Sequence, residues 1–271
     1  MASLTAILPK SSIFKIAIDG PAASGKSTTA RHVAHRLGFT YIDSGAMYRA
    51  ITLKALRRNI QFESPSEMPH IINLANTSKI HFATTTPIGG SGNDNTPQTI
   101  VYLDDEDVSA DIRTMNVSRN VSFVAALPEV RKAMLAKQRR YANSTDIDGV
   151  VMDGRDIGTA VLPDAQVKIF LTAITNVRAM RRYEQLKKKE KELVVYEEIL
   201  RDIEKRDKAD LERKVSPLRK AIDAVVLDTT TLSLSEIVGK IIEMTNNMKS
   251  DAVQLSGINS SLNESTIQTQ I

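Results

Sequence analysis

The segment GPAASGKST, residues 20–28, constrains the fold more than any other part of the sequence. It follows a short apolar run, KIAIDG, that is typical of a buried strand. It leads into residues 26–38, whose pattern predicts a helix closed by Gly38. A glycine-rich turn between a buried strand and a helix is the connection found in parallel α/β sheets. We therefore expect an α/β protein with this turn at the carboxyl end of a strand, where such sheets bind ligands.

The same segment has the chemistry of a phosphate-binding loop. Its glycines let successive backbone N–H groups point inward, and the positive end of the following helix adds to their field. Lys26 would reach the β and γ phosphates of a nucleotide, and Ser27 would offer its hydroxyl to Mg²⁺. We found no guanine-reading NKxD motif, so we expect ATP with Mg²⁺. The predicted nucleotide-binding residues are Gly20, Pro21, Ala22, Ala23, Ser24, Gly25, Lys26, Ser27 and Thr28.

Strands and helices alternate along most of the chain, which favours a parallel, doubly wound sheet. Apolar runs predict further strands over residues 39–43, 149–154, 167–172 and 224–230. Helices are predicted over residues 45–58, 67–76, 116–127, 128–143, 176–192, 196–213 and 235–248. Residues 80–84 and 100–104 alternate like a small antiparallel hairpin around the flexible loop PIGGSGNDNTPQ. From about residue 249 no apolar period remains, so we expect a disordered tail.

Composition excludes several classes of protein. The 271 residues include no cysteine, which rules out disulfides, Cys-ligated zinc and thiol catalysis, and the four histidines suggest no ligand set. No apolar run approaches the length of a membrane helix, and the N-terminus lacks the features of a targeting signal, so we expect a cytoplasmic protein.

Charge is unevenly distributed. The net charge of +4 is concentrated in residues 178–220, which hold 15 Lys and Arg and 10 Asp and Glu. A basic segment that also contains many acidic residues is suited to reversible binding of a polyanionic ligand. Aromatic residues make up only 4%, with no pattern for base stacking, so we expect small nucleotides rather than nucleic acid as ligands. We also expect a monomer.

Three further motifs carry candidate acceptor-site residues. DSGAMYR (43–49) and DGRDIGT (153–159) each follow a predicted strand, at the sheet edge where the phosphate loop lies. In the second motif, Asp153 is placed to help hold Mg²⁺ through water, although these residue types also build ordinary turns. In the third, Arg206, Asp210 and Arg213 share one face of a predicted helix. They form either a local salt bridge or an arginine-bearing lid that closes over phosphate.

Together these motifs, with VSADIRT, VSFVAALPEVR, DGRDIGTAVLPDAQVKIFL and RAMRR in order, resemble the bacterial-type cytidylate kinases of the nucleoside monophosphate kinase family. The resemblance covers roughly residues 14–245. It implies a P-loop kinase fold of three α/β/α layers, with a central parallel five-stranded sheet, a small inserted monophosphate-binding region and a short helical lid. The implied boundaries are one domain over 13–248, with core 13–47, 127–182 and 214–248, insert 48–126, lid 183–213, and flexible tails 1–12 and 249–271.

The resemblance also implies an activity, the transfer of the γ-phosphoryl group of Mg·ATP to CMP or dCMP, and a set of roles. The cytosine would be bound by Ser122, Arg131 and Asp156, the acceptor phosphate by Arg49, Arg155 and Arg213, and the sugar by Arg206 and Asp210. Ser44 would line the acceptor site, Ser27 and Asp153 would serve the metal, and Arg181 would lie on the ATP side. The charge stabilisation would fall to Lys26, Arg155, Arg206 and Arg213.

Cytosine chemistry agrees with these roles, because the carboxylate of Asp156 accepts well from the N4 amino group. Two alternatives remain at this point. One is a kinase of the same core acting on UMP, AMP or a shikimate-like acceptor, and the other is a catalytically idle module that binds ATP or nucleic acid.

Overall fold

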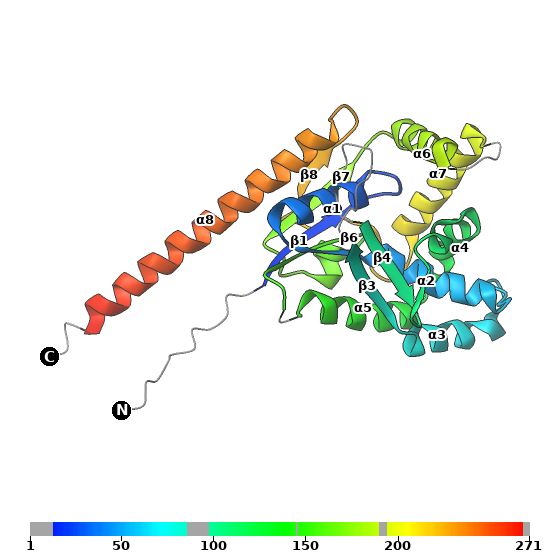
Figure 1. The fold of residues 1–271 in the computed structure, drawn as a ribbon, viewed down its shortest axis with the longest axis horizontal. Helices are drawn as coiled ribbons and strands as arrows, with labels where there is room; N and C mark the ends of the chain where they lie inside the picture. The colour runs from blue at the N-terminus through cyan, green and yellow to red at the C-terminus, as the bar shows by residue number, and fades with distance from the viewer. Residues whose placement is uncertain (1–12, 86–97, 145, 190–193, 268–271) are drawn as a thin grey trace.

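A parallel sheet of five strands forms the centre of the molecule. The computed structural model describes residues 13–85, 98–144, 146–189 and 194–267, with backbone alone for 188–189 and 252–267. The strand order is β2-β6-β1-β7-β8, all parallel (Figure 1), which confirms the predicted sheet. The strands are β1 (Phe14–Asp19), β2 (Thr40–Asp43), β6 (Gly149–Gly154), β7 (Val167–Thr172) and β8 (Val225–Asp228).

The register of the strands places the functional motifs at one edge of the sheet. Along β1 and β6, Ile18 lies opposite Asp153 and Asp19 opposite Gly154. On the other side of β6, Asp43 of β2 also lies opposite Asp153. Because all these strands are parallel, the phosphate loop, DSGAMYR and DGRDIGT start side by side at the carboxyl edge.

Helices cover both faces of the sheet, as the predicted three layers require. On one face, α1 (Lys26–Leu37) and α8 (Leu234–Ile267) bury an apolar cluster with Ile16, Ile18 and Leu171. On the other face, α5 (Pro128–Ala142) and a short π-helix η3 (Ile157–Val161) pack against Ala17 and Met152. Helix α1 ends at Gly38 in a left-handed conformation, as predicted.

The inserted region has a hydrophobic cluster of its own, which runs from Ala46 to Ala125 and takes in Val130 and Met134 of α5. The predicted antiparallel hairpin is confirmed by the pairing of β3 with β4, and its flexible loop lies almost wholly outside the described residues. The elements of the region are α2 (Ser44–Arg57), η1 (Pro65–Glu67), α3 (Met68–Thr77), β3 (Ile80–Thr85), β4 (Gln98–Leu103), β5 (Glu106–Asp107), η2 (Asp111–Arg113) and α4 (Met115–Ala126).

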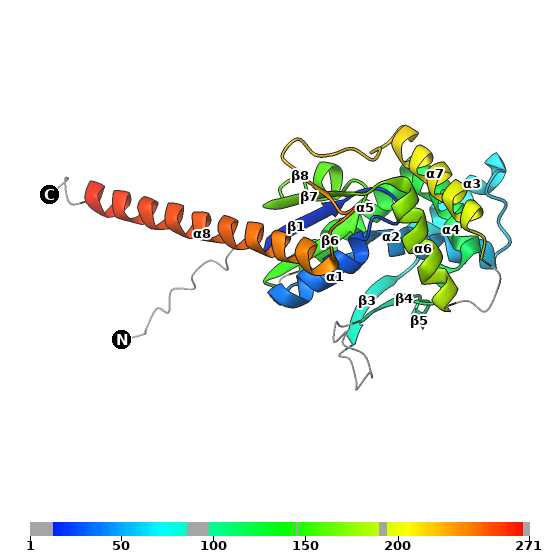
Figure 2. The ribbon, with the colours of Figure 1, turned by 90° about the horizontal axis from the view of Figure 1, so that it is seen from above.

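Two charged helices, α6 (Thr175–Lys189) and α7 (Tyr196–Glu212), form a hairpin beside the insert (Figures 1 and 2). Their shared cluster is small, with Ala179, Leu186, Ile199 and Ile203 as its buried members. The lid that the resemblance implies, residues 183–213, overlaps this hairpin, and we call α6 and α7 together the lid below.

The last helix corrects one expectation. Helix α8 continues to Ile267 and projects away from the rest of the structure (Figures 1 and 2), where the sequence pattern predicts disorder from about residue 249. Its first turns are docked through Ile237, Val238 and Ile241. A docked helix needs no new nucleation, so each added residue gains one hydrogen bond even without an apolar face. None of the described helices combines the length and apolarity that a membrane span requires.

Candidate functional site

The phosphate loop adopts a tight curl between β1 and α1. Gly20 and Gly25 have φ values of +150° and +87°, and Ala23 between them has φ +56°. A Cβ atom on Gly20 would lie 2.0 Å from the carbonyl oxygen of Leu171 at the end of β7. Since that neighbour is backbone, only glycine permits the loop to lie so close to the sheet.

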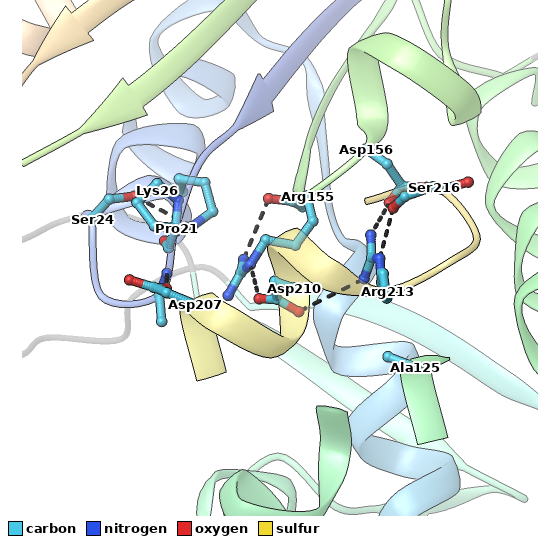
Figure 3. A network of polar contacts seen from close by, with 12 residues as sticks. Pro21, Ser24, Lys26, Ala125, Arg155, Asp156, Asp207, Asp210, Arg213 and Ser216 are labelled. Atoms are coloured by element: carbon cyan, nitrogen blue, oxygen red, sulfur yellow. Dashed lines mark hydrogen bonds and ion pairs between the residues drawn. The ribbon is translucent and has the colours of Figure 1, made fainter. Parts of the chain in front are cut away.

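Lys26, the first residue of α1, lies inside this curl and is buried. Its Nζ donates to the carbonyl oxygen of Pro21 at 2.6 Å and to Ser24 Oγ at 3.3 Å (Figure 3). Burial, and then the charge of Arg155, lower the pKa of Lys26 well below its ordinary value. The ammonium group is therefore held at the concave side of the loop, while Ser27 and Thr28 are exposed at the start of the helix.

Asp153 at the end of β6 is the carboxylate next to the loop. Its two oxygens accept from Ser27 Oγ and Tyr41 Oη, both at 2.8 Å, and its carbonyl oxygen accepts from Ser44 Oγ at 2.6 Å. Burial, and then the neighbouring charge of Asp43, raise the pKa of Asp153 to about 6.

Ser27 and Asp153 offer oxygen atoms, which fit the preference of Mg²⁺. Among the described residues, no group of three His, Cys, Asp or Glu could hold a metal ion.

A chain of alternating charges extends from the loop towards α5. Arg155 Nε donates to Asp210 Oδ2 at 2.7 Å, and Arg213 lies between the two carboxylates, 3.7 Å from Asp210 Oδ1 and 3.5 Å from Asp156 Oδ1. Asp156 also forms an ion pair with Arg131. Figure 3 shows this order, from the loop through Arg155 and Asp210 to Arg213 and Asp156.

These carboxylates and guanidinium groups come from α5, α7 and the turn after β6, so the chain joins the core to the lid. Burial acts to raise the pKa of Asp210, but Arg155 and Arg206 hold it below its usual value. Asp210 therefore pairs with Arg155 and, three residues along the chain, with Arg213, rather than with Arg206 as the i,i+4 spacing predicts.

Two further arginines add positive charge here. Arg206 Nε is buried and has no hydrogen-bond partner among the described residues. Burial, and then the charge of Arg155, lower the pKa of Arg206 to about 10. Arg49 on α2 donates to the carbonyl oxygen of Ile112 at 3.0 Å and to Ser118 Oγ at 2.9 Å. Burial, and then the charge of Arg206, lower its pKa to about 9. Such a concentration of buried cations favours a phosphate dianion.

A pocket of about 200 Å³ lies at the far end of the charge chain. Arg131 and Asp156 line it, with Tyr48, Gln138 and Ser216 among its other walls. The guanidinium carbon of Arg131 lies 5.6 Å from the centre of the Tyr48 ring, which helps hold it in place. The pocket thus joins a cation and a carboxylate in a space open to a small planar ligand.

Two of the predicted site residues lie apart from these groups. Ser122 is half-buried on α4, outside the residues that line the pocket. Arg181 on α6 donates to Thr229, to its Oγ1 at 3.0 Å and its carbonyl oxygen at 2.5 Å, at the end of β8.

Several residues that organise the site are not predicted from the sequence. Asp19 accepts from the backbone N–H groups of Ile157 and Gly158 at 2.8 and 2.7 Å, and so fixes the turn that carries Arg155 and Asp156. Tyr41 orients Asp153, and Arg178 and Asp207 contact the backbone of the phosphate loop. In the sequence, these roles are indicated only by the position of Asp19 next to the phosphate loop and that of Asp207 next to Arg206.

Comparisons with known proteins place residues 16–247 in one family. A sequence model described as cytidylate kinase matches residues 16–247. The chain is 51% identical over 229 residues to a cytidylate kinase of Caldanaerobacter subterraneus subsp. tengcongensis, covering 84% of this chain and 93% of that protein. It is 47% identical over 229 residues to a cytidylate kinase of Bacillus velezensis, covering 84% and 95%. A cytidylate kinase of Bacillus pumilus is 47% identical over 228 residues, covering 84% and 94%.

Proposed function

The chain belongs to the cytidylate kinase family, and from this premise we propose that it transfers the γ-phosphoryl group of Mg·ATP to CMP or dCMP, giving ADP and CDP or dCDP. The observation that carries the proposal is the pocket formed by Arg131 and Asp156, which is joined to the phosphate loop side of the site by a continuous chain of charges. A nucleotide bound there directs its phosphate towards Arg155 and Arg213.

Asp156 and Arg131 have the chemistry to select cytosine. A carboxylate oxygen of Asp156 accepts from the N4 amino group of the base, while Arg131 donates to its N3 and O2 atoms. Uracil has a carbonyl oxygen in place of the amino group, so it would oppose an acceptor to an acceptor. Leaving such polar groups unpaired costs about 1–3 kcal/mol, which disfavours UMP.

Lysine and arginine side chains bind the phosphate groups of ATP and of the acceptor nucleotide. Lys26 binds the phosphates of ATP inside the curl of the loop, and Arg181 acts on the ATP side. Arg49, Arg155 and Arg213 hold the acceptor phosphate. Arg206, next to Asp210 at the sugar, stabilises the charge that spreads over the transferring group. Phosphoryl transfer depends mainly on positioning and charge stabilisation, so the mechanism requires no general base.

Ser27 Oγ and Asp153 would hold Mg²⁺, which would neutralise charge at the phosphate oxygens when bound. For the protein's own part, Tyr41 and Ser27 keep the Asp153 carboxylate oriented towards the start of α1. Closure of α6 and α7 excludes water, which separates transfer to CMP from hydrolysis of ATP.

The first test is a coupled assay of ADP release with Mg·ATP and a panel of acceptors: CMP, dCMP, UMP, AMP, GMP and none. We expect ADP release that requires CMP or dCMP, with UMP much poorer and with little hydrolysis when no acceptor is present. ADP release that is indifferent to CMP, or absent with every acceptor, would contradict the proposal.

A further inference from the structure

Both backbone polar groups of Ala22, in the phosphate loop, are bound by side chains of α6 and α7. Asp207 on α7 accepts from the backbone N–H of Ala22 through Oδ1 at 2.9 Å and from Arg178 Nη1 through Oδ2 at 2.5 Å. The same nitrogen of Arg178 donates to the carbonyl oxygen of Ala22 at 2.9 Å. The three residues therefore form a closed ring of hydrogen bonds around the loop, and Figure 3 shows Asp207 directly beside it.

The ring is buried and braced. The side chains of Arg178 and Asp207 are 6% and 14% exposed, so their charged hydrogen bonds are little weakened by water. Arg178 is held by two further bonds, from Nε to the carbonyl oxygen of Ala173 at 2.9 Å and from Nη2 to Thr175 Oγ1 at 2.8 Å. Asp207 thus meets a rigid partner rather than a mobile surface cation.

Apolar packing supports the same contact independently. Ala23, the next residue of the loop, packs against the small cluster shared by α6 and α7, which includes Ile199 and Ile203. The loop therefore contacts the lid twice, through apolar packing of Ala23 and through the hydrogen bonds of Ala22.

The ring lies one helical turn before a second contact between α7 and the core. Asp207 and Asp210 are three residues apart, and Asp210 pairs with Arg155. Two fixed points one turn apart define how far α7 is rotated about its axis. They therefore set the direction of Arg206, which directly precedes Asp207 and whose Nε has no hydrogen-bond partner among the described residues.

We propose that Asp207 and Arg178 are positioning residues that couple the lid to the phosphate loop, so that the lid presents Arg206 to the transferring phosphoryl group only while the backbone N–H of Ala22 donates to Asp207. The inference rests on the proposed phosphoryl transfer for its catalytic consequence. The coupling itself is a property of the chain and is measurable without turnover.

The position of the lid gives the first test. Because the chain has no cysteine, Arg36→Cys on α1 and Glu204→Cys on α7, both exposed, introduce two specific sites for spin labels. Pulsed dipolar EPR on the otherwise unchanged protein is expected to give a single narrow distance distribution. Asp207→Ala in this background is expected to give a broader distribution at longer distance, and Asp207→Asn, which keeps one acceptor oxygen, a smaller change.

Lys208→Ala is the matched control, because Lys208 is the exposed neighbour of Asp207 on the same helix. It is expected to leave the distribution unchanged. A distribution that is the same in Asp207→Ala and Asp207→Asn as in the parent would overturn the proposal. If Asp207→Ala fails to fold, the distance distribution of Asp207→Asn compared with that of the parent tests the proposal.

Kinetics give the second test. Loss of alignment of Arg206 is expected to lower kcat of Asp207→Ala by about 10²-fold, with the KM for CMP within about twofold because the pocket is untouched. Arg178→Ala is expected to cause a similar loss of kcat, and the double variant no greater loss, since both substitutions break the same ring.

Additive losses of kcat, or a raised KM with unchanged kcat, would contradict the coupling. If the parent shows no CMP-dependent ADP release, the proposed function fails, while the label distances still test the coupling.

Discussion

At the scale of single residues, Asp156 is notable because it balances two buried cations, Arg131 and Arg213. Removal of its charge by alanine would leave Arg131 without a counter-ion and Arg213 with Asp210 alone. Breaking a buried pair in this way costs about 3–5 kcal/mol. Loss of activity in such a variant would therefore mix instability with a changed base preference, so the role of Asp156 needs a substitution of the same shape.

Asp156→Asn also removes the charge, but it keeps the shape and one acceptor oxygen, and a ratio of two substrates measured on the same protein does not depend on how much of that protein is folded. Its amide oxygen still accepts from cytosine, and its amide nitrogen can donate to the carbonyl oxygen of uracil. We expect the ratio of kcat/KM for CMP to that for UMP to fall about tenfold or more, as an opposed acceptor pair costs about 1–3 kcal/mol. The measurement is the acceptor assay with both nucleotides. Asp164→Asn, at an exposed carboxylate paired with Lys15, serves as the control, and an unchanged ratio in Asp156→Asn would exclude base reading by this residue.

Asp19 gives a prediction about pH. Burial raises the pKa of its carboxyl group from 3.8 to about 6 in the folded protein. The folded state then holds a proton that the unfolded state has already lost, so the contribution of Asp19 to stability is full below about pH 3.8 and is lost as the pH rises through about 6. The whole shift corresponds to about 3 kcal/mol.

We therefore expect the free energy of unfolding of the parent, relative to that of Asp19→Asn, to be larger at pH 5.0 than at pH 7.5 by about 1–2 kcal/mol. Urea unfolding of both proteins at the two pH values measures this difference. A difference that does not change with pH would mean that Asp19 titrates normally.

At the scale of secondary-structure elements, the lid has the smallest hydrophobic cluster of those in the described part of the chain. The four buried residues of its cluster are shared by two long charged helices. Ile199→Ala removes a large part of this packing, at a cost of about 2–5 kcal/mol. We expect faster hydrogen exchange of the amides of α6 and α7, with no change in β1 and β6, when the exchange is followed by mass spectrometry.

Glu204→Ala, on the exposed side of α7, should leave exchange in the lid unchanged. Equal acceleration in the sheet and the lid would show instead that the two unfold as one unit.

The elements also show which parts of the fold could be predicted. The parallel strands were predictable because their apolar runs, such as that ending at Asp19, are bounded by turn residues. The π-helix at Ile157–Val161 was not, because it follows from the two backbone hydrogen bonds to Asp19 rather than from a local pattern. The extension of α8 was missed because it depends on docking of the first turns, which periodicity does not record.

The candidate site divides in the same way. Lys26, Asp153 and the arginines of the lid could be named because each belongs to a contiguous motif. Asp207 could not be assigned a partner, since it bonds to Ala22, which is 185 residues away in the chain. Contacts of this kind are set by tertiary structure alone.

At the scale of the whole molecule, the docked and projecting parts of α8 make different contributions. The described buried residues of the helix end with Thr245, and the last described contact of its docked part is Lys249 over the rings of Phe14 and Phe39. A chain that ends at Ser250 should therefore keep its Tm within about 2 °C and retain its activity.

A chain that ends at Gly239 loses Ile241 from the core beside the sheet and should melt about 10 °C lower. Scanning calorimetry of the two truncated proteins tests this. An equal loss of Tm in both would show that the projecting half of α8 stabilises the fold.

The strand order has a consequence for synthesis on the ribosome. Strand β1 emerges first, yet both of its partners, β6 and β7, follow the insert. About 130 residues separate the end of β1 from the start of β6, which at 5–20 residues per second is a delay of roughly 7–26 s. The insert completes its own cluster by Met134 and can fold within that delay. The apolar side chains of Ile16 and Ile18 therefore stay without their neighbouring strands until late in synthesis, and the first strand to be made is among the last to be paired.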